Sequence, residues 1–253
     1  MYHKTALITG ASSGIGRATA RQLAKEGYAL VLCGRRENRL VELQQELAEK
    51  VPVTTLCFDV SHADEVQNAI SQLPEAFQAI ALLVNNAGNA HGLEPIQEGA
   101  LSDWDAMIDS NVKGVLYVTH AVLPGMIARG TGTIINIGSI AGKEVYPNGN
   151  VYCATKHAVD ALTRSMRLDL NAKGIRVAAV HPGLVETEFS EVRFKGDSAR
   201  AEQVYKGYTP LRPEDIADLI GYMVTRPPHV SISDVTILAS AQANATQVTK
   251  QLV

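Results

Sequence analysis

Tyr152 and Lys156 are the residues of this sequence whose types and spacing best suit acid–base chemistry. They lie four positions apart in the helical segment GNVYCATKHA, so their side chains share one helix face. A tyrosine with its ordinary pKa of about 10 is a poor base at neutral pH, but a neighbouring ammonium should lower that pKa by roughly one to three units. The pair therefore suits proton transfer to or from an alcohol oxygen, although Tyr-x-x-x-Lys alone is more often a surface pattern.

Ser139 is a candidate for holding the reacting oxygen beside Tyr152. It ends the predicted strand TIINIGS, 13 residues before the tyrosine, at the expected functional edge of the same sheet. Its hydroxyl can hydrogen-bond an alcohol or carbonyl oxygen there. A serine directly after a strand is more commonly a turn or cap residue, and both interpretations stay open.

A glycine-rich turn, TGASSGIG, follows the first apolar run and precedes a helical pattern. Its residues Gly10, Gly14 and Gly16 let the chain turn sharply and approach a pyrophosphate with its backbone. The helix after them offers free N–H groups and the positive end of its dipole. The spacing departs from GxGxxG, and glycines can equally mark a tight helix–strand contact. Their position between a strand and a helix nevertheless predicts dinucleotide binding.

Arg35 and Arg36 indicate which dinucleotide binds. A site for NAD places an acid about 20 residues past the glycines, against the ribose 2′-hydroxyl. Here the two arginines lie 19 and 20 residues after Gly16, and guanidinium groups bind a 2′-phosphate through charge-assisted hydrogen bonds. The sequence thus predicts NADP, the alternative being a solvated pair that opens the next helix. Asp59 and Asn86, which follow the third and fourth apolar runs, suit adenine and ribose contacts or helix caps.

Seven short apolar runs alternate with longer helical patterns. The runs lack alternating polarity and end at Gly, Asn, Asp or Pro, as parallel strands covered on both faces do. They are Ala6–Thr9, Ala29–Cys33, Val53–Phe58, Leu82–Asn85, Thr133–Ser139, Val177–Val180 and Asp234–Ala239. We expect one α/β domain over residues 1–253, a Rossmann-type doubly wound parallel sheet with helices on both faces. Ligands bind beyond the carboxyl ends of such strands, where the residues above should meet.

Composition excludes several other classes of protein. With 46% hydrophobic residues, a net charge of −3 and no basic block, the 253-residue chain predicts neither nucleic-acid nor membrane binding. It has no apolar run long enough to span a bilayer and no signal-peptide pattern at its start, so we expect a cytoplasmic protein. His91, His120 and His157 lack metal-ligand spacing, so no metal is predicted. Cys33 and Cys57 are expected as reduced thiols in the strand core.

The motifs TGASSGIG, NNAG, DSNVKG, Ser139, YCATK and HPG occur in this order over nearly the whole chain. Together they are highly specific, and the sequence resembles the single-domain branch of the short-chain dehydrogenase/reductase family. The resemblance implies a catalytic tetrad in which Tyr152 is the acid–base and Ser139 orients the substrate oxygen. Lys156 would bind the nicotinamide ribose and lower the pKa of Tyr152. Asn111, in a helix, would hold a water that joins Lys156 to a proton relay.

The resemblance also implies the cofactor contacts and the assembly. Residues after Pro182 lie against the nicotinamide carboxamide in this family, and its long helices form dimer and tetramer interfaces, which implies a homotetramer. His181, just before Pro182, is more typical of a structural histidine than of a cofactor contact. The implied cofactor-binding residues are Gly10, Ser12, Ser13, Gly14, Ile15, Gly16, Arg35, Arg36, Asp59, Val60, Asn86, Ala87, Gly88, Tyr152, Lys156, Pro182, Gly183, Val185 and Thr187.

Residues 185–211 lie where the family keeps its substrate lid, and the stretch EFSEVRFKGD within them fits neither a helix nor a strand pattern. In LVETEFSEVRFKGD, GLEPI, LPGM and IGSIAGKEVYPNGNVYCATK, the sequence is similar to the NADP-dependent 3-hydroxy acid dehydrogenases. That resemblance implies small substrates such as serine, L-allo-threonine and 3-hydroxypropionate, or their 3-oxo products. A substrate carboxylate needs a cation near the reacting hydroxyl, and Arg193 and Lys195 are the candidates. Both can instead pair with lid carboxylates in solvent.

Two other classes of function stay open. One is an NADPH-dependent carbonyl reductase of larger ketones, sugars or steroids, which a purely apolar lid would favour; this lid is charged. The other is a nucleotide-sensing protein without turnover. Such proteins often lose the tyrosine or the lysine, and this sequence has both Tyr152 and Lys156.

Overall fold

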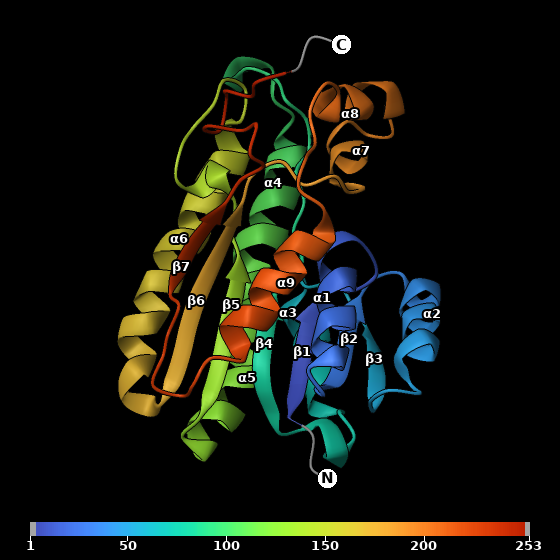
Figure 1. Cartoon of the computed structure of the whole chain (residues 1–253), viewed down its shortest axis with the longest axis vertical. Coiled ribbons are helices and arrows are strands. Elements are labelled where there is room, and N and C mark those ends of the chain that lie inside the picture. The colour runs from blue at the N-terminus through green and yellow to red at the C-terminus, as the bar shows by residue number, and fades with distance from the viewer. Residues whose placement is uncertain (1–3, 251–253) are drawn as a thin grey trace.

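The computed structural model describes residues 4–250, and these form a parallel sheet of seven strands (Figure 1). The strand order is β3-β2-β1-β4-β5-β6-β7, so the direction of winding reverses between β1 and β4. The strands are β1 (Thr5–Thr9), β2 (Ala29–Gly34), β3 (Val53–Cys57), β4 (Ile80–Asn85), β5 (Gly132–Ile137), β6 (Ile175–Pro182) and β7 (Asp234–Ile237). Every predicted run overlaps one of them, and the doubly wound Rossmann-type fold is confirmed.

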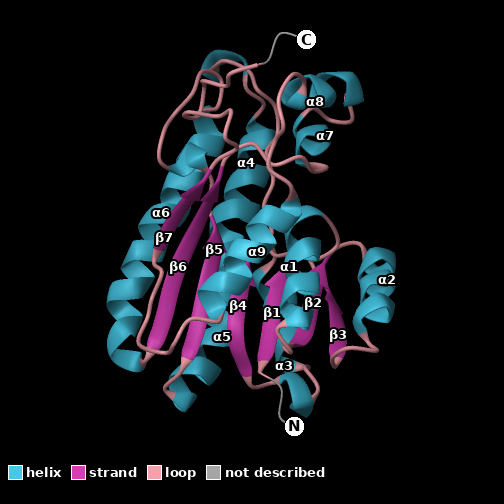
Figure 2. Cartoon of the chain, viewed as in Figure 1, coloured by secondary structure: helices cyan, strands magenta, loops and turns pink. Residues whose placement is uncertain are grey.

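Helices cover both faces of the sheet and its carboxyl end (Figure 2). One face packs against α1 (Gly14–Lys25), α2 (Glu37–Leu47) and α9 (Pro213–Val224). The other packs against α3 (Ala63–Ser71), α5 (Gly114–Arg129) and α6 (Asn150–Leu170), with α4 (Leu101–Ile108) leading into α5. Above the carboxyl ends of the strands lie α7 (Phe189–Arg193) and α8 (Ser198–Tyr205).

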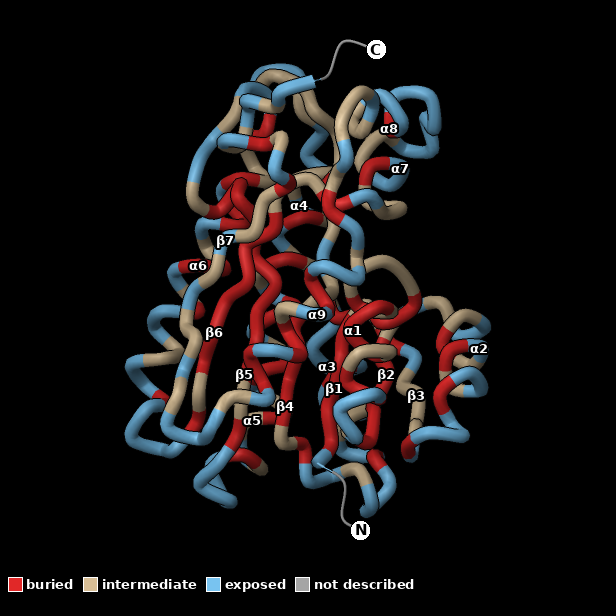
Figure 3. The backbone as a smooth tube through the Cα atoms, in the orientation of Figure 1, coloured by how far each residue is buried: buried red, intermediate tan, exposed pale blue. Residues whose placement is uncertain are grey.

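The sheet separates two apolar cores because successive residues of a strand point to opposite faces. In β2, Leu30 and Leu32 join the core with α1, α2 and α9, whereas Val31 and Cys33 join the core with α3 and α5. Burial is concentrated in the central strands (Figure 3). Cys57 is exposed, so the prediction that it lies in the strand core was wrong. The strand that carries it, β3, is an edge strand with a neighbour on one side only.

A buried ladder of polar side chains crosses the centre of the fold. Asn85 of β4 donates its amide to Asn136 of β5 and to Thr119 of α5, each at 2.9 Å. Asn136 in turn donates to Thr163 of α6 at 2.9 Å. A slip of either strand or helix would leave buried amides unpaired, which is costly in an apolar core. The ladder therefore fixes the position of α6 against the sheet.

Local structure near the carboxyl edge differs from the sequence prediction in two places. β5 ends at Ile137, and Ser139 instead caps the 3₁₀ turn Ile140–Gly142, its hydroxyl accepting the Ala141 N–H at 3.1 Å. Asn111 lies in a helical segment, as predicted, and that segment is the π-helical turn Asp109–Lys113 between α4 and α5. The lid stretch without periodicity contains α7 and the start of α8. Across residues 4–250, every helix is too short or too polar to cross a membrane.

Candidate active site

A cleft of about 340 Å³ lies at the carboxyl ends of the central strands. All the predicted cofactor residues line it except Gly16, which lies beneath the glycine turn. A Cβ atom at Gly16 would lie 2.3 Å from the Gly10 carbonyl oxygen, so no larger residue fits there. Asn86 holds the same turn, because its amide donates to the carbonyl of Thr9 at 2.9 Å. The turn is thus packed tightly enough to bring backbone N–H groups against a pyrophosphate.

The two arginines predicted to act together have different partners. Arg36 donates to the hydroxyls of Ser12 and Ser13, the latter at 2.6 Å, and to the Glu188 carboxylate at 2.8 Å. Arg35 has a side chain that is 68% exposed and reaches only Asp59, at 3.3 Å. The solvated alternative therefore describes Arg35, whereas the side chain of Arg36 contacts Ser12 and Ser13 of the glycine turn.

Sequence reasoning missed Arg39, which also donates to Glu188, at 2.6 Å. It lies on the first turn of α2, three residues after Arg36, so the helical spacing of the two arginines was a usable signal. Glu188 lies near the start of the lid segment, so the guanidinium groups of Arg36 and Arg39 connect the lid to the adenosine end of the cleft. Asp59 accepts from the backbone and hydroxyl of Ser61, so it forms a local turn as well as lining the cleft.

Tyr152, Ser139 and Lys156 meet on one wall of the cleft. Ser139 lies close enough to Tyr152 for its hydroxyl to lower the pKa of the phenol, and it also caps its own turn. Lys156 donates to the Ile137 carbonyl at 3.0 Å, and its ammonium lies 5.9 Å from the centre of the Tyr152 ring. Burial lowers the pKa of Lys156 to about 8. The arrangement can hold a substrate oxygen between a hydroxyl and a phenol.

Burial raises the pKa of the Tyr152 phenol above its ordinary value of 10.0. The Arg193 guanidinium opposes this rise most, and the Ser139 hydroxyl opposes it next. The pKa of Tyr152 thus lies above its ordinary value because desolvation of the phenolate outweighs the nearby charges. The expected lowering of this pKa by Lys156, whose ammonium lies 5.9 Å from the ring centre, stays a prediction.

Asn111 is almost fully buried beside the cleft, without lining it. Its side chain accepts from the Asn89 N–H and donates to the Asn89 carbonyl, both at 2.8 Å, and to the Thr155 hydroxyl at 3.1 Å. It therefore connects the loop after β4 to α6, on the turn of helix between Tyr152 and Lys156. The π-helical turn that carries it is a form found often at functional sites.

Arg193 extends from α7 over the Tyr152 ring. Its guanidinium carbon lies 4.8 Å from the centre of that ring and 5.1 Å from the centre of the Phe189 ring. One terminal nitrogen donates to the Tyr146 hydroxyl at 3.0 Å. Its Nε is buried and has no hydrogen-bond partner among residues 4–250. Cation–π contacts thus hold a charged group that still has a donor to offer.

Neither predicted substrate cation lines the cleft: Arg193 lines a smaller pocket beside it that Tyr152 also lines, and Lys195 lines neither. Its side chain is 62% exposed and pairs with Asp103 at 2.9 Å. The expected pairing of the lid cations with lid carboxylates does not occur for either residue in the part of the chain that the structure describes. Glu188 binds Arg36 and Arg39, and Asp197 caps α8. Tyr146 and Phe189, which hold Arg193, had no signal in the sequence beyond their aromatic character.

Gln242, from the segment after β7, contacts the turn that follows β6. Its side-chain oxygen accepts the Leu184 N–H at 2.9 Å, and the residue is buried. A Cβ atom at Gly183 would lie 2.1 Å from that oxygen, so the contact requires glycine. The predicted cofactor residues Gly183 and Val185 are therefore positioned by a residue that sequence reasoning did not single out.

Comparison with known proteins agrees with this geometry. Residues 4–198 match the family model described as short chain dehydrogenase. The chain is 48% identical over 238 residues to sulfoacetaldehyde reductase 2 of Chromohalobacter salexigens, covering 94% of each chain. It is 44% identical over 240 residues to an NADP-dependent 3-hydroxy acid dehydrogenase of Salmonella typhimurium, covering 94% and 96%. A solved structure, the closed form of serine dehydrogenase complexed with NADP+, is 40% identical with a TM-score of 0.92, covering 98% and 100%.

Proposed function

The chain belongs to the short-chain dehydrogenase family, and from this premise we propose that it is an NADP-dependent oxidoreductase of small acidic alcohols and aldehydes. The first candidates are 3-hydroxy acids such as serine, L-allo-threonine and 3-hydroxypropionate, with their 3-oxo products. The second is sulfoacetaldehyde, which is in the name of a relative that is 48% identical. In all of these molecules one carbon separates the acidic group from the carbon that reacts.

Arg193 is the observation that carries this proposal. Its guanidinium lies 4.8 Å from the centre of the Tyr152 ring, and its buried Nε is unpaired within the described residues. A carboxylate or sulfonate accepts from Nε while an oxygen of the same small molecule reaches the Tyr152 hydroxyl. Larger neutral ketones would leave this charged donor buried and unpaired, which disfavours them. Residues 185–211, which include Arg193, act as the lid of a single domain.

The glycine turn and Arg36 fit NADP. Gly10 and Gly16 allow the tight turn that brings backbone N–H groups against a pyrophosphate beside the start of α1, and Arg36 with Ser12 and Ser13 provides donors for a 2′-phosphate. Arg35 is left as a weaker, solvated contact. When bound, the nicotinamide accepts or supplies the hydride. Lys156 provides a positive charge and a donor for the nicotinamide ribose.

Tyr152 transfers the proton, and Ser139 holds the substrate oxygen in reach of it. In reduction the phenol donates its proton to the carbonyl oxygen as the hydride reaches the carbon; in oxidation the phenolate removes the hydroxyl proton. Since burial raises the pKa of Tyr152, the phenol is the form present at neutral pH, which favours reduction there. Asn111 supports the wall through α6, in line with the relay that the family resemblance implies.

We assign the protein to the cytoplasm as a homotetramer, as the family resemblance implies. Exposed apolar side chains on the long helices support the assembly: Leu116 and Ile127 on α5 and Leu168 on α6 are all more than one-third exposed. Such residues gain free energy when a second copy covers them. Light scattering coupled to size exclusion tests this, and a monomer at micromolar concentration would contradict it.

Absorbance of NADPH, followed with a panel of substrates, tests the reaction. The panel contains serine, L-allo-threonine, 3-hydroxypropionate, sulfoacetaldehyde and neutral compounds of matched and larger size. We expect kcat/KM to be at least about tenfold higher for acids than for size-matched neutral compounds, since a charge-assisted bond contributes about 1.5–3 kcal/mol. Preference for bulky neutral ketones would support the carbonyl reductase alternative. Tight NADPH binding without turnover would support nucleotide sensing.

A further inference from the structure

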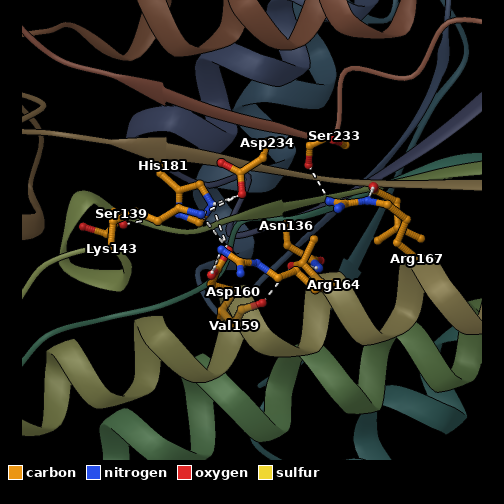
Figure 4. Close-up of polar contacts among 12 residues, drawn as sticks. Asn136, Ser139, Lys143, Val159, Asp160, Arg164, Arg167, His181, Ser233 and Asp234 are labelled. Atoms are coloured by element: carbon orange, nitrogen blue, oxygen red, sulfur yellow. Dashed lines mark hydrogen bonds and ion pairs between the residues drawn. The ribbon is translucent and has the colours of Figure 1, made fainter.

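A partly buried cluster of ionisable side chains lies next to the site and takes no part in the reaction proposed above (Figure 4). It consists of Lys143 from the turn after β5, Asp160 from α6, His181 from β6 and Asp234 from β7. None of the four lines the cleft. Buried ionisable groups are costly, so a cluster of them beside Ser139 calls for a physical role.

His181 is the member of the cluster that reaches the site. Its ring is 0% exposed, and Nδ1 lies 3.3 Å from the carbonyl oxygen of Ser139. A Cβ atom at Gly138 would lie 2.4 Å from the same nitrogen, so the ring packs directly against the backbone of Gly138 and Ser139. The imidazole therefore helps to set the position of the peptide that carries the Ser139 hydroxyl.

The rest of the cluster holds the ring from its other side. Lys143 donates to Asp160 at 2.9 Å and to Asp234 at 2.6 Å, and Arg164 pairs with Asp160 at 2.8 Å. Two cations thus offset two carboxylates and leave the imidazole of His181 neutral. The ligand atoms of Asp160, His181 and Asp234 lie within 4.8 Å of one another, a spacing that suits a metal ion, but the Lys143 ammonium already binds both carboxylates.

The single N–H of a neutral imidazole belongs on Nδ1. Ser139 offers Nδ1 a carbonyl acceptor at 3.3 Å. Nε2 lies farther from its neighbours, 3.5 Å from Asp160 and 3.7 Å from Asp234, and has no hydrogen bond within residues 4–250. Those carboxylates are already satisfied by Lys143.

The cluster also connects His181 to the helix that carries Tyr152. Tyr152, Lys156 and Asp160 lie at successive four-residue intervals on α6, so one face of that helix supplies all three. Through Asp160 and Lys143, the turn with Ser139 and the helix with Tyr152 share one set of contacts. The distance between the two catalytic hydroxyls is therefore set partly from this side.

We propose that His181 is a positioning residue that acts through Ser139: its Nδ1–H holds the Ser139 carbonyl so that the hydroxyl stays against Tyr152, and Lys143, Asp160 and Asp234 hold the ring. The proposal rests on the proposed function, because the position of Ser139 matters only if Ser139 takes part in the reaction. A misplacement of about 1 Å in such a contact can cost on the order of 100-fold in rate.

Three variants at one position test the role. His181→Asn keeps an amide close to the place of Nδ1, His181→Gln places its amide at Nε2, and His181→Leu removes both donors. We expect Leu and Gln to lower kcat about 10- to 100-fold with the KM for NADPH changed less than about twofold, and Asn to stay within about threefold of the wild type. Arg167→Met is the matched control, because Arg167 ties α6 to the carbonyls of Val177 and Ser233 without contacting Ser139. It should lower the melting temperature and leave kcat unchanged.

A double-mutant cycle with Ser139→Ala decides whether the effect passes through Ser139. In that background His181→Leu should lower kcat less than about twofold further. The proposal would be overturned if the loss of kcat in the double mutant equalled the product of the two single losses. It would also be overturned by an unchanged kcat in folded His181→Leu, or by equal losses of kcat in the Asn and Gln variants. If the Leu variant does not fold, the contrast between Asn and Gln gives the answer. If the wild type turns over substrate and the His181 variants keep its kcat, only the role of His181 is overturned. If the wild type does not turn over substrate, the proposed function is overturned as well.

Discussion

Arg193→Met tests the proposed substrate class most directly. Methionine keeps much of the length and apolar contact of the arginine with the rings of Tyr152 and Phe189, but it has neither the charge nor the Nε donor. If Arg193 binds the acid of the substrate, catalysis should fail for acids and persist for neutral aldehydes of the same size.

The size of the loss follows from the surroundings of the guanidinium. Truncating one partner of a buried, hydrogen-bonded charge pair costs about 2–5 kcal/mol. Arg193 is only partly buried, and Tyr146 keeps one of its donors, so about 2–3 kcal/mol is appropriate. At about 1.4 kcal/mol per factor of ten, kcat/KM for the acid should fall roughly 30- to 150-fold.

The assay compares an acidic aldehyde with propanal, using NADPH oxidation by the wild type, Arg193→Met and Lys195→Met. Lys195 is the matched control, since it lies two residues away and pairs with Asp103 in solvent. Because Arg193 also lowers the pKa of Tyr152, both substrates should show the same small shift in their pH profiles. Their ratio isolates the contact with the acid.

Equal losses for the acid and for propanal would refute the reasoning, because Arg193 would then act only on Tyr152 or on lid packing. If kcat/KM for the acid fell as far in Lys195→Met as in Arg193→Met, the effect would come from the total charge of the lid and not from Arg193 in particular. Retention of kcat/KM for the acid in Arg193→Met would remove the proposed substrate class.

Tyr152→Phe should lower kcat at least about 100-fold in either direction, the usual scale for lost acid–base catalysis, and near-normal turnover in a steady-state assay would contradict its role. Since burial raises the pKa of Tyr152, kcat for oxidation should rise with pH through the alkaline range while kcat for reduction falls, which paired pH profiles would check. Arg36→Ala should raise the KM for NADPH far more than that for NADH, whereas Arg35→Ala, with a side chain that is 68% exposed, should change either by less than about threefold. Burial lowers the pKa of His181 below its ordinary 6.5. As the pH falls below 6.5, the unfolded chain therefore binds a proton at this residue before the folded chain does, and the folded state loses stability. His181→Asn should reduce this acid-side fall in melting temperature, and an identical fall would show that His181 does not cause it.

Sequence patterns predicted what depends on local spacing. The glycine turn, the positions of Tyr152 and Lys156 on one helix face and the seven apolar runs can each be identified from residues that are close together in the sequence. Arg36 and Glu188 are 152 residues apart in the sequence, and no periodic pattern predicts their contact. It depends on how the lid folds, which a charged segment without periodicity does not encode in its local pattern.

Burial explains much of what could not be predicted. Spacing places Lys156 near Tyr152, but the pKa of a phenol in a protein also depends on how much water the whole fold excludes. Cys57 looked like a core residue because its strand is apolar, yet the strand lies at the edge of the sheet. Arg193 and Lys195 are only two residues apart in the sequence, so predicting that they contact different partners would have required the direction of α7.

Gln242 has a consequence for the order in which the site forms during synthesis. It comes later in the chain than every residue that lines the cleft, and its contact with Leu184 completes the turn after β6. A chain made from the amino end therefore has its glycine turn, Tyr152 and lid before it has the group that fixes the nicotinamide end. Until Gln242 has been made, the turn after β6 lacks the side chain that accepts the Leu184 N–H, so this end of the cleft is the last to gain its contacts.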